Sequence, residues 1–380
     1  MRKVVHITTV HSPFDARVFH KEAKTLVQAG YDVTLIAQHD KNEVVDGVKI
    51  IPLPKSRNRL QRMLGLTSKA FHLAFRQRAD IYHFHDPELI PIGMLLTLVT
   101  KAKVIYDVHE DYVQHMLFKE WFPSSLRRIA SWFMWQIEKI SARSFAAIIT
   151  PTDAITERFQ KLRARKVRTL HNFPLLEFGS ANSHETVLTL QFDLIHTGTL
   201  SSPRLSFMFS VARELKQMGY NFKWCILGAS PEMIKWAESE MKKEGPDISE
   251  NFVFIEKVPH TVVCRYLLQS KIGVNHHLAE PRFLAAIPVK VFEYMACGLP
   301  VISSDLPLLR KLLGGKNCAI LVRPGDVGAF ANSVKYLLDN PVVAGEMGTK
   351  GMELIKEKYN WEKEEENLLS LYQELLEEEK

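Results

Sequence analysis

The sequence predicts an α/β protein with two doubly wound domains, each built around a parallel sheet. Three observations predict this class. Short apolar segments of strand length alternate with helix-length segments along the 380-residue chain. A stretch rich in proline, glycine and small polar residues interrupts this alternation near the middle of the chain. The alternation then resumes, so the second half is expected to repeat the architecture of the first.

The first half reads as strands joined by helical crossovers. A helix is expected at residues 16–29, and Gly30 ends it because glycine readily adopts the left-handed conformation that follows a helix. Strands are expected at residues 4–10, 31–37, 48–53, 81–84, 104–107, 147–150 and 167–170.

The break in the pattern defines the domain boundaries. We expect a first domain at residues 1–172, a connector at 173–189, a second domain at 190–358 and a separate C-terminal segment at 359–380. Within that last segment, residues 361–380 form a long charged helix that should pack away from the second core. Two such domains would face each other across a central cleft at the carboxyl ends of their strands, where ligands of doubly wound sheets bind.

The second half repeats the alternation of the first. Strands are expected at residues 192–196, 223–227, 252–255, 272–275 and from residue 301 onward. Helices are expected at residues 205–218, 231–243, 262–269 and 330–338.

The composition is typical of a soluble globular protein, with 46% hydrophobic and 24% charged residues. The longest apolar stretch, residues 89–100, contains Pro91 and Gly93 and is too short to span a bilayer. The N-terminus runs directly into a strand without a secretory signal, so a cytoplasmic protein is expected. Its four cysteines show no paired spacing, which favours reduced thiols and argues against structural zinc.

Basic charge is concentrated in the first half of the chain. Residues 1–178 hold 27 Lys and Arg against 17 Asp and Glu, and residues 55–78 hold seven basic residues and no acid, interleaved with large apolar side chains. This pattern predicts contact with an anionic membrane surface, hence a peripheral protein at the inner face of the cell membrane. The alternative is an amphipathic helix that packs its apolar side on the sheet. Nucleic-acid binding is not expected, because no recognition motif accompanies the basic segment.

The segment from 288 to 302 is the most informative in the chain. It predicts a loop, a short helix, a stop at Gly298 and Pro300, and a buried strand. Lys290 and Glu293 are three residues apart and share one face of this helix. A cation and a carboxylate beside a helix N-terminus suit the phosphates and ribose of a sugar nucleotide. The alternative is a salt-bridged surface helix.

A second polar cluster spans residues 196–204, after the first strand of the second half. Gly198 allows close backbone approach, and Arg204 lies near the start of the next helix, where a guanidinium can hold a diphosphate. The alternative is a turn with a solvated arginine. Because the chain has no Asp-x-Asp motif for Mg²⁺, Arg204 and Lys290 are expected to supply the positive charge. We therefore expect neither a metal nor a cofactor.

Two polar clusters follow strands of the first half. In residues 8–17, Asp15 and Arg17 are candidates for contact with a second substrate, although Asp15 can instead cap the following helix. In residues 83–88, His85 lies among groups that suggest a metal site. Asp86 followed by Pro87 is typical of a helix start, and we favour that interpretation.

A third cluster, residues 106–112, follows an apolar strand. Polar groups at such strand ends are common sites of catalysis in α/β proteins. His109 is the first candidate for a catalytic residue and Glu110 the second.

Together these clusters resemble the family-4 retaining glycosyltransferases of the GT-B fold, over nearly the whole chain. The resemblance implies that His109 lies against the transferred sugar, that Arg204 holds the donor diphosphate and that Glu293 binds ribose. Ala285 stands where the family's motif has a first glutamate, so the chain is most similar to a subgroup with a Pro-x-Lys-x-x-Glu motif. The C-terminal segment resembles one that crosses back to the first domain. The resemblance rests on Asp15 and Arg17, on residues 106–110 and 198–204, on Gly228 and on residues 290–300.

The resemblance implies transfer of a sugar from a nucleotide-diphosphate donor, UDP- or GDP-linked, to a cell-envelope glycan or lipid-linked acceptor, with retention. The acceptor side is assigned to Asp15, Arg17 and His85. The alternatives are a nucleotide-sugar epimerase and a non-catalytic subunit of a glycan assembly complex. Donor binding is assigned to Gly198, Thr199, Arg204, Gly228, Lys290 and Glu293.

Overall fold

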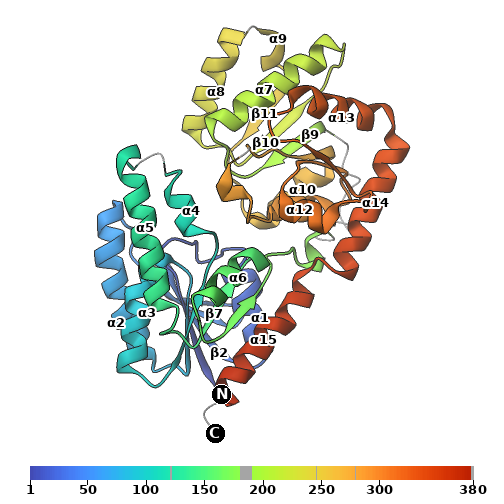
Figure 1. The fold of residues 1–380 in the computed structure, drawn as a ribbon. Coiled ribbons are helices and arrows are strands. Elements are labelled where there is room, and N and C mark those ends of the chain that lie inside the picture. The colour runs from blue at the N-terminus through green and yellow to red at the C-terminus, as the bar shows by residue number, and fades with distance from the viewer. Residues whose placement is uncertain (120–121, 180–190, 245, 279, 378–380) are drawn as a thin grey trace. The chain divides into compact units, whose positions relative to one another are not determined.

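The computed structural model describes residues 1–119, 122–179, 191–244, 246–278 and 280–377. The chain divides into two compact units (Figure 1): an N-terminal unit of Met1–Asn172 with Trp361–Lys380, and a C-terminal unit of Phe173–Asn360. Each unit has its own sheet, so the predicted α/β fold with two parallel-sheet domains is confirmed. Residues 180–189 of the expected connector and 378–380 of the expected C-terminal segment lie outside the described residues.

The N-terminal unit contains an eight-stranded sheet of order β3-β4-β2-β1-β5-β6-β7-β8. All its neighbouring strands pair in parallel except β3, which runs antiparallel to β4. The chain order reverses between β1 and β5, and ligands of doubly wound sheets bind at such a switch point. The strands are β1 (Lys3–Ile7), β2 (Asp32–Gln38), β3 (Glu43–Val45), β4 (Val48–Leu53), β5 (Ile81–Phe84), β6 (Lys103–Asp107), β7 (Ala147–Thr150) and β8 (Val167–Thr169).

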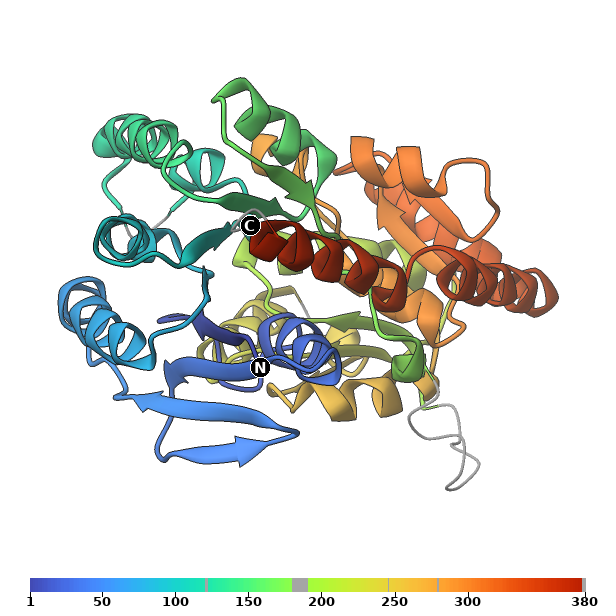
Figure 2. The ribbon, with the colours of Figure 1, turned by 90° about the horizontal axis from the view of Figure 1, so that it is seen from below.

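Helices cover both faces of this sheet. Figures 1 and 2 show α2, α3 and α5 side by side on one face, with α1 and α15 on the other. The C-terminal helix α15 is held there by Trp361, whose Nε1 donates to Thr25 Oγ1 at 3.0 Å. The helices are η1 (Val18–Ala23), α1 (Lys24–Gln28), η2 (Gln61–Leu66), α2 (Thr67–Gln77), η3 (Pro87–Leu89), α3 (Ile90–Val99), α4 (Tyr112–Met116), α5 (Ser124–Ser141), α6 (Asp153–Lys161) and α15 (Trp361–Glu377).

The C-terminal unit contains a six-stranded, all-parallel sheet of order β11-β10-β9-β12-β13-β14. Its chain order reverses between β9 and β12, so the expected binding position lies after these two strands. The strands are β9 (Phe192–Thr197), β10 (Trp224–Leu227), β11 (Phe252–Ile255), β12 (Ser270–Asn275), β13 (Val301–Ser304) and β14 (Ala319–Val322).

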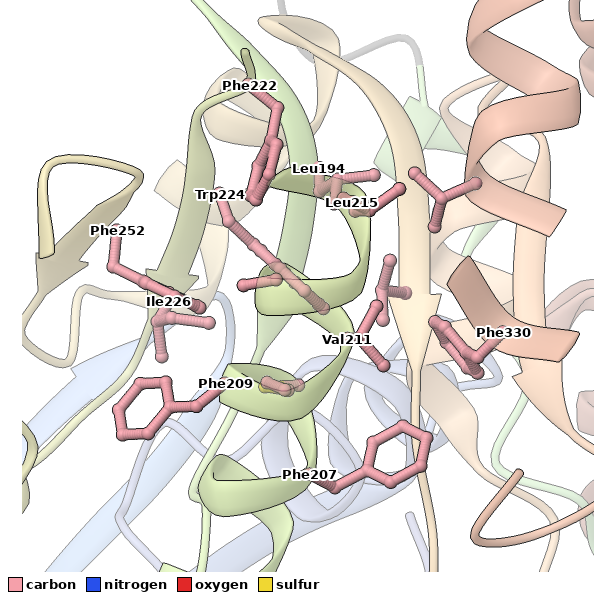
Figure 3. Packing of buried hydrophobic residues seen from close by; sticks show 14 of the residues in the cluster. Leu194, Phe207, Phe209, Val211, Leu215, Phe222, Trp224, Ile226, Phe252 and Phe330 are labelled. Atoms are coloured by element: carbon pink, nitrogen blue, oxygen red, sulfur yellow. The ribbon is translucent and has the colours of Figure 1, made fainter. Parts of the chain in front are cut away.

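Apolar side chains pack on both faces of this sheet. On one face, helix α7 lays Phe209 and Leu215 against Trp224 (Figure 3). Phe207 of the same helix stacks on His276 with ring centroids 3.5 Å apart, which fixes the first turns of α7 beside the end of β12. The helices are η4 (Leu176–Gly179), α7 (Ser202–Gln217), α8 (Pro231–Glu244), α9 (Pro246–Ser249), α10 (His260–Leu268), η5 (Pro281–Phe283), α11 (Val289–Ala296), α12 (Pro307–Leu313), α13 (Val327–Asp339) and α14 (Pro341–Glu357).

The first strand and helix differ from the prediction. The strand expected at 4–10 ends at Ile7, because the next residues turn towards Asp86, whose Oδ2 accepts the N–H of Thr9 at 2.6 Å. The helix expected at 16–29 begins with the π-helical segment η1 before the α-helix α1. The predicted helix start at Pro87 is correct, but the Asp86 side chain binds the β1 loop rather than capping its own helix.

Candidate functional site

Two glycines shape the carboxyl end of the C-terminal sheet. Gly198 follows β9 with φ of 86°, and Gly228 follows β10 with φ of 100°. A Cβ added to Gly228 would lie 3.2 Å from Gly198 Cα, and one added to Gly198 would lie 3.4 Å from Lys290 Nζ. The positive φ angles favour glycine at both positions, and the close contact with Gly198 adds crowding at Gly228, so the two loops can approach each other closely.

Arg204 lies in the first turn of α7 and is only 8% exposed. Its Nε donates to the carbonyl of His276 at 2.8 Å, and its Nη1 lies 3.5 Å from the carbonyl of Thr199. Its Nη2 is buried and has no hydrogen-bond partner among the residues that the structure describes. Burial lowers the pKa of this guanidinium to about 10. The alternative of a solvated arginine is therefore wrong, and a buried cation with an unused donor is suited to bind an anion.

Lys290 extends towards the same loop from the first turn of α11. Its Nζ donates to the carbonyl of Thr197 and lies 3.3 Å from His196 Nε2. Burial, together with the positive charge of Arg204, lowers the pKa of Lys290 to about 7. Two cations thus lie near each other at the switch point of this sheet.

Glu293 lies one turn after Lys290, and its Oε1 lies 2.8 Å from His260 Nε2. The two residues of the predicted pair therefore engage different partners, which disfavours the alternative of a simple surface salt bridge. The sequence pattern did not reveal His260, because the helix that it begins was expected to start two residues later. The predicted helix stop is correct, since Gly298 has φ of 73° directly after α11.

Asp107, at the end of β6, is the centre of the polar cluster in the N-terminal unit. Its Oδ2 accepts Arg17 Nε at 3.0 Å, and its Oδ1 accepts Arg17 Nη2 at 2.9 Å. Its Oδ2 also lies 3.2 Å from His85 Nδ1 and 3.3 Å from His109 Nε2. Burial alone would raise the pKa of Asp107, but Arg17 and His109 hold it well below its usual value.

Arg17 and His85, both assigned to the acceptor side, are more deeply buried than that assignment suggests. Arg17 is 3% exposed and His85 is fully buried, and both contact Asp107. Their contact with an acceptor stays a prediction, while their observed contacts orient Asp107. Asp15 is partly exposed, and its Oδ1 accepts the N–H groups of Arg17 and Val18, as expected of a helix cap.

The two predicted catalytic residues have different surroundings. The His109 side chain is 14% exposed and is oriented by Asp107. Glu110 is 38% exposed and forms an ion pair with His115 at 3.1 Å. His109 is therefore held in one orientation by a buried carboxylate, whereas Glu110 makes a surface contact.

His11 belongs to this cluster, although the sequence did not single it out. Its ring lies 4.5 Å from the ring of His109, and its nitrogens lie 3.4 Å from Asp15 and 3.6 Å from Asp86. Burial alone would lower the pKa of His11, but the two carboxylates outweigh it and raise the pKa. The only signal in the sequence that could have identified His11 as a site residue was its position in the loop after β1.

The face formed by η2, α2, α3 and α5 exposes large apolar side chains. Basic residues surround them, including Arg57 and Arg59 before η2 and Arg128 on α5. Among the described residues, no helix is both long and apolar enough to cross a membrane. The exposed apolar side chains are Leu60, Met63, Leu64, Phe75, Leu95, Leu98, Val99, Leu126, Ile129, Trp132, Phe133, Ile137 and Ile140.

Comparison with known proteins gives a consistent result. The family model for Glycosyltransferase Family 4 matches residues 16–174, and that for Glycosyl transferases group 1 matches residues 191–340. A phosphatidyl-myo-inositol mannosyltransferase of Mycobacterium leprae is 21% identical over 93% of this chain and 88% of its own length. An alpha-D-kanosaminyltransferase of Streptomyces kanamyceticus is 20% identical over 84% of this chain and 80% of its own length.

Solved structures share the fold over nearly the full chain. A sucrose-phosphate synthase from Thermosynechococcus elongatus superposes with a TM-score of 0.78 and 16% identity, covering 99% of both chains. The Anabaena protein HepE, in complex with UDP and glucose, superposes with a TM-score of 0.72 and 12% identity, covering 98% of this chain and 100% of its own. With two family models matched in succession along most of its length, this chain belongs to the family-4 glycosyltransferases of the GT-B fold.

Proposed function

We propose that this glycosyltransferase moves a hexose or N-acetylhexosamine from a nucleotide-diphosphate donor to a cell-envelope glycan or lipid-linked acceptor, with retention. The observation that carries the donor assignment is the pair of cations in the C-terminal unit. Arg204 presents a buried Nη2 without a partner, and Lys290 lies against the same loop. Two cations at the switch point of a doubly wound sheet match the charge of a diphosphate.

In this proposal the cations act on the leaving group. As the glycosidic bond to the diphosphate breaks, negative charge grows on the departing phosphate oxygens, and Arg204 and Lys290 stabilise that charge. Gly198, Thr199 and Gly228 form the surrounding loops, and Glu293, oriented by His260, accepts hydrogen bonds from ribose hydroxyls. His109 of the N-terminal unit lies against the transferred sugar.

The choice of donor and acceptor draws on relatives. HepE binds UDP and glucose, which favours a UDP-linked donor, with GDP as the alternative. The mycobacterial relative is a phosphatidyl-myo-inositol mannosyltransferase, which supports an acceptor carried on a lipid.

Peripheral contact with the membrane would bring the enzyme to such an acceptor. The exposed apolar side chains of η2 and α2 lie among the basic residues of 55–78, and α5, on the same side of the sheet (Figure 2), adds the exposed Trp132 and Phe133. Apolar insertion combined with basic charge favours an anionic bilayer surface. The proposed location is the inner face of the cell membrane.

A donor panel followed by an acceptor assay tests the function. The full chain is screened by thermal shift against UDP-, GDP-, dTDP- and ADP-sugars, and the stabilising donor is incubated with envelope lipid extract. A shift with one base, followed by a glycosylated product whose anomeric configuration matches the donor by NMR, is expected. Stabilisation by no donor, or hydrolysis without transfer to any extract component, would contradict the proposal.

A further inference from the structure

Three histidines and a glutamate form a buried cluster in the N-terminal unit. His6 on β1 pairs in register with His83 on β5, and His85, directly after the end of β5, lies two residues beyond His83 on the same side. Glu22 of η1 covers them from the helix side. All four side chains are fully buried, so bulk solvent does not reach their polar atoms.

The Glu22 carboxylate faces the imidazoles without bonding to them. Its Oε2 is 3.9 Å from His6 Nδ1, from His83 Nδ1 and from His85 Nε2, and within the described part of the chain it has no hydrogen-bond partner. The Nε2 atoms of His6 and His83 are also buried and have no partner among these described residues. Native interiors rarely leave so many polar atoms unsatisfied, and an ion among them is one explanation.

We propose that His6, His83, His85 and Glu22 bind a divalent transition-metal ion, Zn²⁺ by preference, as a structural site. Three imidazoles and one carboxylate form a common four-coordinate set for zinc. Each residue can offer one ligand atom such that all four atoms lie within 4.8 Å of one another. Tetrahedral bonds of about 2.0–2.1 Å place ligand atoms about 3.3 Å apart, so the side chains would have to adjust from their present separations of up to 4.8 Å to close around an ion.

The protonation state of the three imidazoles is compatible with the metal site that the geometry indicates. Burial lowers the pKa values of His6, His83 and His85, so the imidazoles are neutral, which is the form that coordinates metal. Glu22 and Asp107 are two buried carboxylates that share the guanidinium of Arg17. Burial and the nearby Asp107 raise the pKa of Glu22 well above its usual value, so a bound dication would replace a proton on this carboxylate.

Neighbouring groups orient the ligands as outer-shell partners do in zinc proteins. Asp107 contacts His85 at Nδ1, at 3.2 Å, so its Nε2 faces the cluster, where it now shares a hydrogen bond of 2.9 Å with His6 Nδ1 that a metal would replace. The hydroxyl of Tyr372 on α15 lies 2.8 Å from His83 Nδ1, which leaves His83 Nε2 available. Arg17 Nε lies 2.9 Å from Glu22 Oε1, which leaves Oε2 for the ion.

The ion would join four elements of the unit. It would cross-link β1, β5 and η1 directly and reach α15 through Tyr372. It would also fix His85, which touches both Asp107 and His109. Because every ligand is buried, the site is closed and its role is structural. This inference concerns the N-terminal unit alone and does not depend on the proposed donor or acceptor.

The first test measures metal content. The full chain is produced in zinc-supplemented medium, and zinc per chain is measured by mass spectrometry after chelator-free gel filtration. We expect about one zinc per chain in the wild type and in the control His39→Asn. His39 is a suitable control because it contacts Glu43 and lies outside the cluster. Glu22→Gln and His6→Asn should each lose most of it. Zinc at equally low levels in the wild type and in Glu22→Gln would overturn the proposal.

A second test uses only the wild-type chain, so its outcome does not depend on whether a variant folds. The wild-type chain is unfolded in guanidinium with chelator, then refolded with Co²⁺, with Zn²⁺ or without metal. Tetrahedral Co²⁺ bands in the visible spectrum and a higher melting temperature with either metal are expected. Refolding to the same melting temperature with and without metal, and without these bands, would show that hydrogen bonds alone satisfy the cluster.

Discussion

Both units carry charged side chains at the carboxyl edge of their sheets, but these charged groups differ in how far their hydrogen-bonding capacity is satisfied. In the C-terminal unit, Arg204 keeps a buried donor unused and Lys290 has a pKa lowered to about 7. In the N-terminal unit, Asp107 is bonded by Arg17 and contacted by two histidines. An unsatisfied buried polar group indicates a position for a ligand, as at Arg204 and at Glu22, whereas a satisfied one such as Asp107 indicates a framework that orients other groups. The donor assignment depends on the difference between Arg204 and Asp107.

The largest expected effect comes from breaking the N-terminal framework. Asp107→Asn leaves the buried Arg17 without its full counter-charge, which should lower the free energy of unfolding by about 3–5 kcal/mol. Urea denaturation measures this. The control Glu110→Gln removes only a surface contact and should change stability by less than about 1 kcal/mol. Equal losses for the two variants would mean that Asp107 is not the centre of the framework.

The next largest effect concerns donor use. Arg204→Ala removes a charged donor from the diphosphate, a loss of about 1.5–3 kcal/mol, or roughly 10- to 150-fold in kcat/KM. The same helix offers a control, Arg213→Ala, because Arg213 is exposed and lies away from the loop after β9. Steady-state kinetics with the matched donor checks this. An Arg204→Ala enzyme as active as Arg213→Ala would remove Arg204 from the donor site.

A smaller effect is expected from pH, through Lys290. Its pKa in the free protein is about 7, so its positive charge is present below this pH and is lost as the pH rises. A bound diphosphate favours the charged form, so donor affinity should fall above pH 7, by at most about tenfold per pH unit. Calorimetric titration of a nucleotide-sugar from pH 6 to 9 measures this, because its diphosphate does not titrate in that range.

Lys290→Arg provides the control for the pH experiment. Because arginine stays charged throughout this pH range, its donor affinity should show no such decline. A decline of the same size in this variant would assign the titration to another group.

The smallest effect is expected at the membrane face. Arg57→Ser with Arg59→Ser should weaken binding to vesicles rich in phosphatidylglycerol by about 1 kcal/mol per charge at most. Vesicle sedimentation compares these variants with Arg323→Ser in the C-terminal unit, which should bind like the wild type. Binding to phosphatidylcholine vesicles should be weak for all of them. Wild-type affinity that is equal for both lipids would contradict an anionic surface as the partner.

Local patterns predicted the fold and the motif of the C-terminal unit well. The helix, the glycine stop and the strand within 288–302 follow from short-range rules of capping and burial, and the structure has them. Lys290 and Arg204 could be proposed because each lies at the start of a helix that follows a strand.

Long-range contacts could not be read from the sequence. Arg17 and Asp107 are 90 residues apart, and only the order of the strands brings them together. The same holds for His6 and His83, which become neighbours through strand pairing, and for His260 beside Glu293. The burial of Arg17 and His85 was not predicted for this reason, because residues in loops between strands and helices are usually expected to be exposed.

The most direct test of the central claim asks whether Arg204 recognises the diphosphate. Calorimetry would measure binding of UDP and of UMP, which lacks the β-phosphate, to the wild type and to Arg204→Ala. If Arg204 holds the diphosphate, the substitution weakens UDP binding by at least tenfold more than UMP binding. Equal weakening of both nucleotides, or none, would contradict the assignment of the two cations to the donor diphosphate.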